Sequence, residues 1–227
     1  MMAVVLFTNC AEMQQFANQF PQDFPVSQFE ISAGLKEALE NGIDKQVSKL
    51  TATNGFYGNE LVKIMLPDEL KTVDARLRSI GLGSLADEGL LMINRAAESA
   101  VKEATPIFID AIKKMSFNDA KNILLGQDNA ATSYLQNTTN QELYNKFKPI
   151  IASSYQKVGA DKIWNSIISK YNTIPLVEKV NPDLTDYTTS RAMEGVFTMI
   201  AVEEKNIRNS VTARSTETLK KVFALQD

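Results

Sequence analysis

Apolar residues recur at every third or fourth position along most of this chain, and no other sequence feature constrains the fold as strongly. Side chains at this spacing share one face of an α-helix. A clear example is the stripe formed by Leu35, Leu39, Ile43, Val47 and Leu50. Alternation typical of a strand occurs at 62–66, where no partner strand is evident. The pattern predicts an all-α fold, a single domain of roughly ten helices.

Several helix boundaries are marked by a hydroxyl residue followed three positions later by an acidic residue, the pattern of a capping box. The pairs are Ser84 with Asp87, Ser116 with Asp119, and Thr139 with Glu142. The helix that begins at Thr139 is expected to end at Gly159 and to be kinked at Pro149, because proline removes a backbone donor. A separate short helix is expected at 128–135.

The chain begins with an apolar run that ends at Cys10, the only cysteine. This run resembles the end of a bacterial lipoprotein signal, although the first basic residue is Lys36. We therefore expect either a truncated signal with a lipid on Cys10 or a cytosolic N-terminus with a buried cysteine. The phenylalanines that are expected to attach this segment to the domain are Phe16, Phe20, Phe24 and Phe29. We assign residues 1–31 to a signal-like or tether segment and residues 32–227 to the helical domain.

The absence of histidine excludes most familiar catalytic centres. Neither a Ser-His nor a Cys-His nucleophile is available, and no His-ligated zinc or iron site can form. The single cysteine also excludes an intramolecular disulfide and a thiolate cluster. The remaining chemistry is that of carboxylates, lysine, tyrosine or serine. We therefore expect neither a metal nor any other cofactor.

Charge and hydropathy narrow the range of partners. A net charge of −3 and a pI near 5.2 argue against nucleic acid, which requires a basic face. No apolar run approaches the ~20 residues of a transmembrane helix. Contact with a membrane is therefore expected only through a lipid on Cys10.

Two adjacent carboxylates near the C-terminus lie on apolar helix faces. Glu204 is in register with Phe197, Ile200 and Ile207, and Glu203 belongs to the neighbouring stripe. At least one of them should therefore lie near the core, where a carboxylate must be paired. Arg208, one turn further on, is the simplest partner for Glu204.

The run 94–98 is the second group of candidate polar residues. Asn94 borders an alanine-rich apolar stripe, while Arg95 and Glu98 are within reach of each other on the next face. The group could form a polar cleft in which Arg95 binds an anion, or a solvated ladder of ion pairs. It could also meet the other long helix, and we hypothesise a buried pair between Arg95 and Glu204 as the central polar contact of the fold.

The segment 126–132 leads from a glycine turn into a helix, a geometry that can hold anions. It lacks the glycines and lysine of a P-loop and the alternating acidic residues of a calcium loop. We interpret it as the end of one helix followed by the start of another.

Short motifs are distributed along most of the chain. They are LKEAL at 35–39 with Gly42, GF at 55–56, GN at 58–59, VKI at 62–64, LP at 66–67, NRAAE at 94–98, MS at 115–116, DA at 119–120, IL at 123–124, AAT at 130–132 with Tyr134, LTDY at 184–187, EEK at 203–205, IR at 207–208 and LKKVF at 219–223. Together they resemble an uncharacterised bacterial family, domain of unknown function 4197, over about residues 32–223.

The resemblance implies a helical domain from Gram-negative bacteria, often preceded in relatives by a signal peptide. It carries no established catalytic residues that could be transferred to this chain. The chain departs from its relatives at Val211, where they tend to have proline, and in lacking the basic start of a signal peptide.

Two functions agree with these features. The first is a non-catalytic helical binding or scaffold protein of the cell envelope, periplasmic or lipid-anchored, whose partner is a protein or another envelope ligand. The alternative is a hydrolase of an envelope polymer that uses Glu98 together with Glu203 or Glu204 as acid and base. A cytoplasmic location is the alternative to export. An enzyme would place these carboxylates in an open cleft, whereas a scaffold would bury them in ion pairs with Arg95 or Arg208.

Overall fold

The computed structural model describes residues 27–79, 83–157 and 183–224, together with the single positions 81, 159, 169, 172, 173 and 179. The helices in this part of the chain are α2 (Gln28–Thr51), α3 (Asp68–Ser79), α4 (Gly83–Val101), α5 (Ala104–Lys114), α6 (Phe117–Leu124), α7 (Ala130–Gln156), α9 (Leu184–Asn209), the 3₁₀-helix η1 (Val211–Ala213) and α10 (Glu217–Phe223). The described residues contain no strand, which confirms the all-α prediction. Their helices are fewer than the roughly ten predicted.

One cause of this difference is the length of α7. The short helix expected at 128–135 and the helix expected from Thr139 form one continuous helix, so the predicted capping box at Thr139 is wrong. The Thr139 hydroxyl instead donates to the Leu135 carbonyl over 2.7 Å, a bond that threonine makes inside helices. Pro149 also lies inside α7.

Two further predicted boundaries have different outcomes. The capping box of Ser116 and Asp119 is confirmed at the start of α6. The box predicted at Ser84 is wrong, because α4 already begins at Gly83 and the Asp87 carboxylate accepts a hydrogen bond from Arg78 over 2.6 Å.

The helical body begins inside the segment that was expected to be a tether. Ser27 and Glu30 form a capping box that starts α2. Phe29, expected to attach the tether to the domain, is 81% exposed. The earlier phenylalanines and Cys10 lie outside the described residues.

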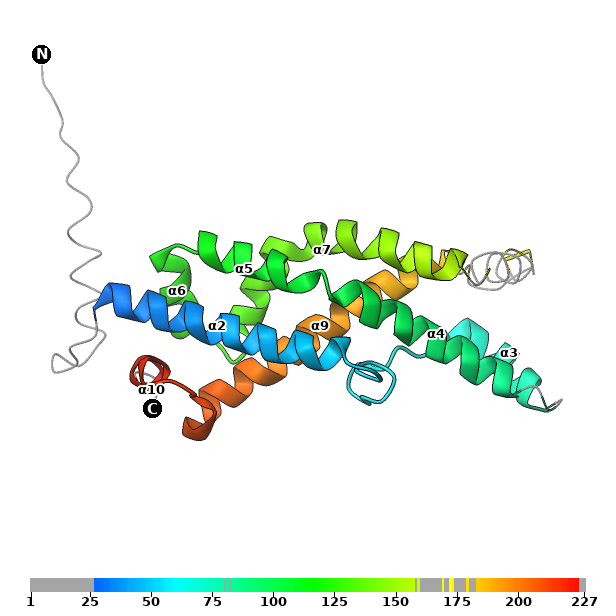
Figure 1. Cartoon of the computed structure of the whole chain (residues 1–227), viewed down its shortest axis with the longest axis horizontal. Helices are drawn as coiled ribbons and strands as arrows, with labels where there is room; N and C mark the ends of the chain where they lie inside the picture. Colours follow the sequence, from blue (N-terminus) through cyan, green and yellow to red (C-terminus); the bar gives the residue numbers. More distant parts are fainter. Residues whose placement is uncertain are drawn as a thin grey trace, which may run out of the picture.

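The long helix α9 is the centre of the fold. It crosses α2, α4 and α7 and packs against all three (Figure 1). Phe197 on α9 makes an edge-to-face contact with Phe108 on α5, with 5.8 Å between the ring centroids. At the other side of α2, α10 packs closely because Gly34 has no side chain, and an added Cβ would lie 2.7 Å from Val222.

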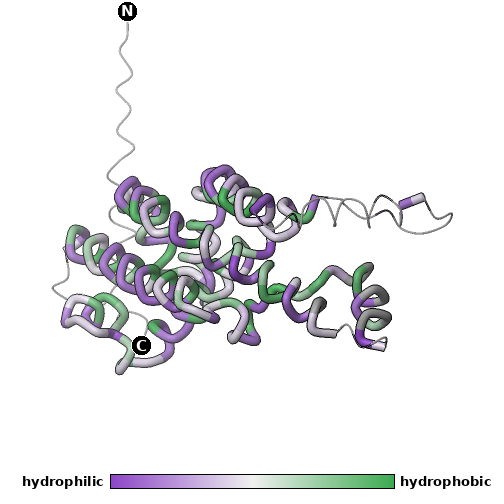
Figure 2. The backbone as a smooth tube through the Cα atoms, turned by 45° about the vertical axis from the view of Figure 1, so that its right-hand side comes forward, coloured by the Kyte–Doolittle hydropathy of each residue, from purple (hydrophilic) through white to green (hydrophobic). Residues whose placement is uncertain are grey.

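A helical arm leaves this body. α3 packs against α4, and together with the N-terminal end of α4 it extends away from the rest of the molecule (Figure 2). The segment 61–67 connects the body to α3 and has no helix or strand of its own. None of the described helices has an apolar stretch long enough to cross a bilayer.

Candidate functional site

Glu204 and Arg208 form a buried ion pair, as their spacing on α9 predicted. Arg208 donates to the Glu204 carboxylate from Nε and Nη2 over 3.1 and 2.9 Å. Both residues are less than a tenth exposed. Charges buried at this depth require partners, and both side chains have further partners at the facing ends of α6 and α7.

The Glu204 carboxylate caps the N-terminus of α7. It accepts hydrogen bonds from the backbone N–H groups of Ala131 and Thr132, over 2.9 and 2.8 Å, and from the Thr132 hydroxyl over 2.8 Å. Asn129 is the N-cap residue by position but makes no side-chain capping bond. A carboxylate is favoured here by the unpaired N–H groups and by the helix dipole.

The Arg208 guanidinium caps the preceding helix. Its Nη2 and Nη1 donate to the carbonyls of Ile123 and Leu124 at the end of α6, over 2.7 and 3.2 Å. The ion pair therefore joins the negative end of α6 to the positive end of α7. The 126–132 turn has an anion-binding geometry, and the anion that occupies it is Glu204 of the same chain.

Glu203 is also buried, on the side of α9 that faces α2. Its carboxylate accepts from Lys45 over 2.6 Å and from the Gln46 amide over 2.5 Å. Gln46 is 1% exposed, and its Oε1 has no hydrogen-bond partner among the described residues. The prediction that at least one of the two adjacent carboxylates lies near the core is confirmed for both.

Glu98 and Arg95 pair with each other, but they do not form the solvated ladder named as one alternative, because Glu98 is buried. The distance from Arg95 Nη1 to Glu98 Oε2 is 2.6 Å. Glu98 is 5% exposed and also accepts from the Phe56 N–H over 3.1 Å, while Arg95 donates to Asn54 over 2.8 Å. The hypothesis of a pair between Arg95 and Glu204 is wrong, because each has its own partner at i+3 or i+4.

Asn94 is fully buried and holds the segment 61–67 against α4. Its amide accepts from the Ile64 N–H and donates to the Ile64 carbonyl, both over 2.9 Å, and it also donates to Leu90. These two bonds replace the bonds that a neighbouring strand would make, so the alternation seen at 62–66 does not require a sheet. The described residues at 62–66 form no strand, in agreement with the lack of a partner strand in the sequence.

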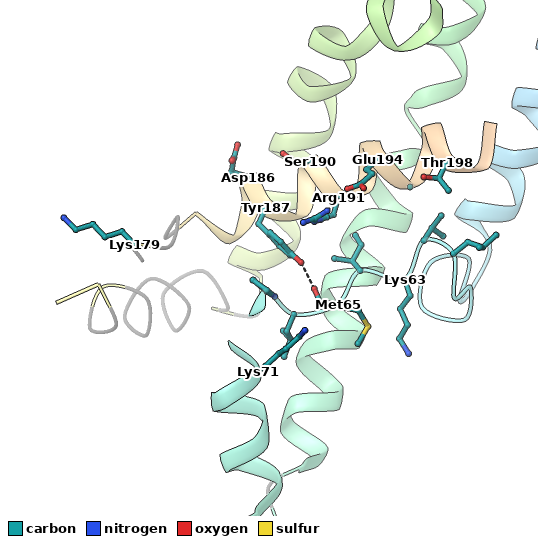
Figure 3. A pocket seen from close by; sticks show the side chains of 16 residues that line it. Lys63, Met65, Lys71, Lys179, Asp186, Tyr187, Ser190, Arg191, Glu194 and Thr198 are labelled. Carbon is teal, nitrogen blue, oxygen red and sulfur yellow. Dashed lines mark hydrogen bonds and ion pairs between the residues drawn. The ribbon is translucent and has the colours of Figure 1, made fainter. Parts of the chain in front are cut away.

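A groove lies beside these contacts, where the arm meets α9 (Figure 3). Its volume is about 780 Å³. One wall is the segment 61–67, and the opposite wall is the N-terminal half of α9. The groove-lining residues on α9 are Asp186, Tyr187, Ser190, Arg191, Glu194, Gly195 and Thr198.

A hydrogen bond connects the two walls. The Tyr187 hydroxyl donates to the Met65 carbonyl over 2.7 Å (Figure 3). Behind this bond, Gly195 allows the Phe56 ring to pack against α9, because a Cβ at this position would lie 2.7 Å from the ring. The groove therefore has a defined shape, set by a hydrogen bond at its rim and by a glycine at its base.

The groove has more basic than acidic side chains. Lys63, Lys71, Lys179 and Arg191 line it, against Asp186 and Glu194. Arg191 donates to Glu194 over 2.7 Å, and this carboxylate raises the pKa of Arg191. Arg191 also lies over the Tyr187 ring, 5.4 Å from its centroid.

A second, smaller depression of about 410 Å³ lies between α7 and the start of α9. Tyr144 donates a short hydrogen bond to Asp186, a residue that also lines the groove. The Lys148 ammonium lies 2.8 Å from the Tyr144 hydroxyl and 3.4 Å from Asp183, and these contacts raise the pKa of Lys148. Asp186 is therefore held by α7, away from the middle of the groove.

None of the six candidate residues from the sequence lines the groove. Apolar helix faces selected Glu203 and Glu204, the spacing to Glu204 selected Arg208, and the motif 94–98 supplied the other three. These features mark internal contacts. The groove residues on α9 are spaced at three and four positions, as in Tyr187, Arg191, Glu194 and Thr198. This spacing was a usable signal, because it describes a polar face of a helix whose opposite face is apolar.

Comparison with known proteins identifies one family. The model of the family described as "Protein of unknown function (DUF4197)" matches residues 25–224. No curated protein and no solved structure matches the chain.

Proposed function

We propose a binding function for this chain, which belongs to the DUF4197 family of proteins of unknown function: it is a non-catalytic helical binding protein of the bacterial cell envelope. Its binding surface is the groove between the segment 61–67 and α9. One observation carries the proposal. The carboxylates that would serve an enzyme are buried in internal bonds, whereas the polar side chains of the groove face solvent.

The alternative, a carboxylate-based hydrolase, has less support. Glycoside hydrolysis requires two carboxyl groups about 5–9.5 Å apart on either side of the substrate. Glu98, Glu203 and Glu204 bind different parts of the fold, and each is less than a tenth exposed. The groove carboxylates Asp186 and Glu194 are eight positions apart on one helix, so the helical rise separates their backbones by about 12 Å.

The location at the envelope rests on the sequence and on the family resemblance. We propose that the native product is processed and lipidated at Cys10, which would hold the helical domain near a membrane. Full-length protein should incorporate radiolabelled palmitate, and the Cys10→Ala variant should not. Equal labelling of both proteins, or an intact Met1 in the purified product, would refute this part of the proposal.

The binding function is tested by photocross-linking in the native host. A benzophenone side chain is introduced at Ser190, which is exposed in the groove, or at Asn206, which is exposed on the same helix outside the groove. We expect a discrete cross-linked product from Ser190 and none from Asn206. The captured partner is identified by mass spectrometry and purified.

The purified partner then provides the decisive measurement. It should bind the unmodified chain at least about tenfold more tightly than an Arg191→Glu variant, a difference of ~1.4 kcal/mol. Identical products from the two cross-linking positions, or equal affinity for chain and variant, would contradict the proposal. Turnover of an envelope polymer that is lost in Glu98→Gln without a loss of stability would instead favour the hydrolase.

A further inference from the structure

The backbone of the segment 61–67 has one edge bonded and one edge facing the groove. Both polar groups of Ile64 point toward Asn94, which accepts from its N–H and donates to its carbonyl over 2.9 Å. In extended backbone, the N–H and carbonyl of one residue lie on the same side, and those of its two neighbours lie on the opposite side. The Lys63 carbonyl and the polar groups of Met65 therefore face away from α4, whereas the Lys63 N–H donates to the Asn59 carbonyl over 2.8 Å.

The Tyr187 bond agrees with this direction. Tyr187 lines the groove on α9, and its hydroxyl reaches the Met65 carbonyl over 2.7 Å. The Met65 N–H and the Lys63 carbonyl lie on the same edge and have no hydrogen-bond partner among the described residues. Met65 as a residue is 54% exposed.

We propose that the groove binds an extended acidic polypeptide segment, which pairs with the backbone edge of residues 63–65 as an added strand. This inference rests on the proposed binding function and names its partner class. An added strand takes its affinity from main-chain hydrogen bonds and its specificity from alternate side chains. Here, the Met65 N–H and the Lys63 carbonyl supply the main-chain bonds.

Charge selects an acidic partner. Both groove carboxylates already have cationic or hydroxyl partners, Glu194 with Arg191 and Asp186 with Tyr144. The lining lysines Lys63, Lys71 and Lys179 leave the groove with an excess of positive charge. A segment that carries glutamate or aspartate at alternate positions would place its carboxylates beside these lysines.

Two features of the groove add to the fit. The exposed side chains of Leu61 and Met65 provide apolar contacts at its rim. The volume of about 780 Å³ lies within the ~300–1,000 Å³ of typical ligand sites, so the groove holds a short stretch of chain.

Fluorescein-labelled peptides test the pairing with the purified full chain. One peptide alternates Glu with Val over about six residues, the usual length of a strand. A second peptide has Lys in place of Glu. Two further forms of the Glu peptide carry N-methyl groups on one or the other set of alternate backbone amides. Binding is followed by fluorescence anisotropy.

We expect the Glu peptide to bind about tenfold or more tightly than the Lys peptide, the factor that corresponds to ~1.4 kcal/mol. Only one of the two N-methylated forms should lose binding, because only one set of amides faces the protein. The charge-reversed double variant Lys63→Glu, Lys71→Glu should lose the same factor. Its control, Lys49→Glu with Lys205→Glu, changes the net charge equally at exposed positions on α2 and α9 and should bind normally.

The inference is overturned if the Lys peptide binds equally, or if N-methylation of both sets has the same effect. It is also overturned if inorganic phosphate or anionic phospholipid vesicles bind the groove while no peptide does, since the groove would then be a site for anions or a membrane surface. Cross-links from Ser190 without any peptide binding would contradict the strand-pairing inference but still support the proposed binding function. If these cross-links are also absent, the result contradicts both.

Discussion

The two halves of α9 carry similar polar residues in opposite settings. In the C-terminal half, Glu204 and Arg208 form an ion pair whose side chains are both 6% exposed. In the N-terminal half, Arg191 and Glu194 form a pair of comparable length whose side chains are 51% and 63% exposed. Buried charges must have their partners within the fold, whereas the energy of an exposed pair is small and its atoms are open to new partners.

The difference teaches where to look for function on a long helix. A polar residue on an apolar stripe is easily noticed in the sequence, but it is buried and its hydrogen bonds are internal. The ordinary polar face of the helix is the one that stays accessible to a partner. In this molecule the buried pair in the C-terminal half of α9 joins α6 to α7, and the exposed polar face of the N-terminal half forms one wall of a groove.

The largest effect is expected for the buried pair. Glu204→Ala or Arg208→Ala should each lower the free energy of unfolding by about 3–5 kcal/mol, because the remaining charge stays buried without its partner. The matched exposed change, Arg191→Ala or Glu194→Ala, should cost less than ~1 kcal/mol. Chemical denaturation of the four variants measures both. Equal losses in the two halves would break the comparison.

The wall of the groove provides the second test. Asn94→Ala should cost about 2–3 kcal/mol, because it leaves the buried N–H and carbonyl of Ile64 without partners. Hydrogen exchange at the Ile64 amide should accelerate. The exposed control Asn206→Ala should change stability by less than ~0.5 kcal/mol. Unchanged exchange at Ile64 would mean that Asn94 does not hold this wall.

Gly195 lies at the base of the groove and allows a test of close packing. Gly195→Ala should destabilise by about 1–2 kcal/mol, because the new Cβ would lie 2.7 Å from the Phe56 ring. Gly89→Ala in α4 should stabilise by ~0.5–1 kcal/mol, since nothing lies within 4 Å of that position and alanine favours a helix. Thermal unfolding of the pair should therefore show shifts of opposite sign.

The smallest effect concerns a polar contact on the buried face of the N-terminal half. The Tyr155 hydroxyl is 2.6 Å from that of Thr188, and Tyr155→Phe should cost about 1 kcal/mol at neutral pH. Burial raises the pKa of Tyr155. The unfolded chain therefore ionises first, and the Tyr155 contribution to stability falls as the pH rises above about 10.

Denaturation at neutral and at high pH tests this sign. The stability difference between the parent chain and Tyr155→Phe should shrink as the pH rises above the ordinary tyrosine pKa. A difference that stays constant or grows would contradict a raised pKa for this residue.

Much of the fold followed from local patterns. The apolar stripe of α2, the capping box of α6 and the Glu204–Arg208 pair each involve residues within a few turns of one helix. Errors arose where a local signal had two meanings. Thr139 can cap a helix or bond inside one, and this choice depends on whether the chain before it is already helical.

The candidate site could be predicted only in part, because its partners are far apart in the sequence. Burial of Glu204 followed from the apolar stripe, but its bonds to Ala131 and Thr132 join positions 73 and 72 residues apart. Asn94 and Ile64, 30 residues apart, show no complementary pattern. The groove depends on the position of the segment 61–67 relative to α9. The residue pattern of a single helix does not predict this position.

The cap that Glu204 places on α7 has a consequence for the order of folding. The N-terminal turn of α7 receives this cap only when α9 docks, so a loop of more than 70 residues must close first. During synthesis, residue 204 leaves the ribosome long after α6 and α7. Until then, the facing ends of these two helices lack the hydrogen bonds from Glu204 and Arg208. We expect this contact to form after the folding transition state, so weakening it should accelerate unfolding far more than it slows folding.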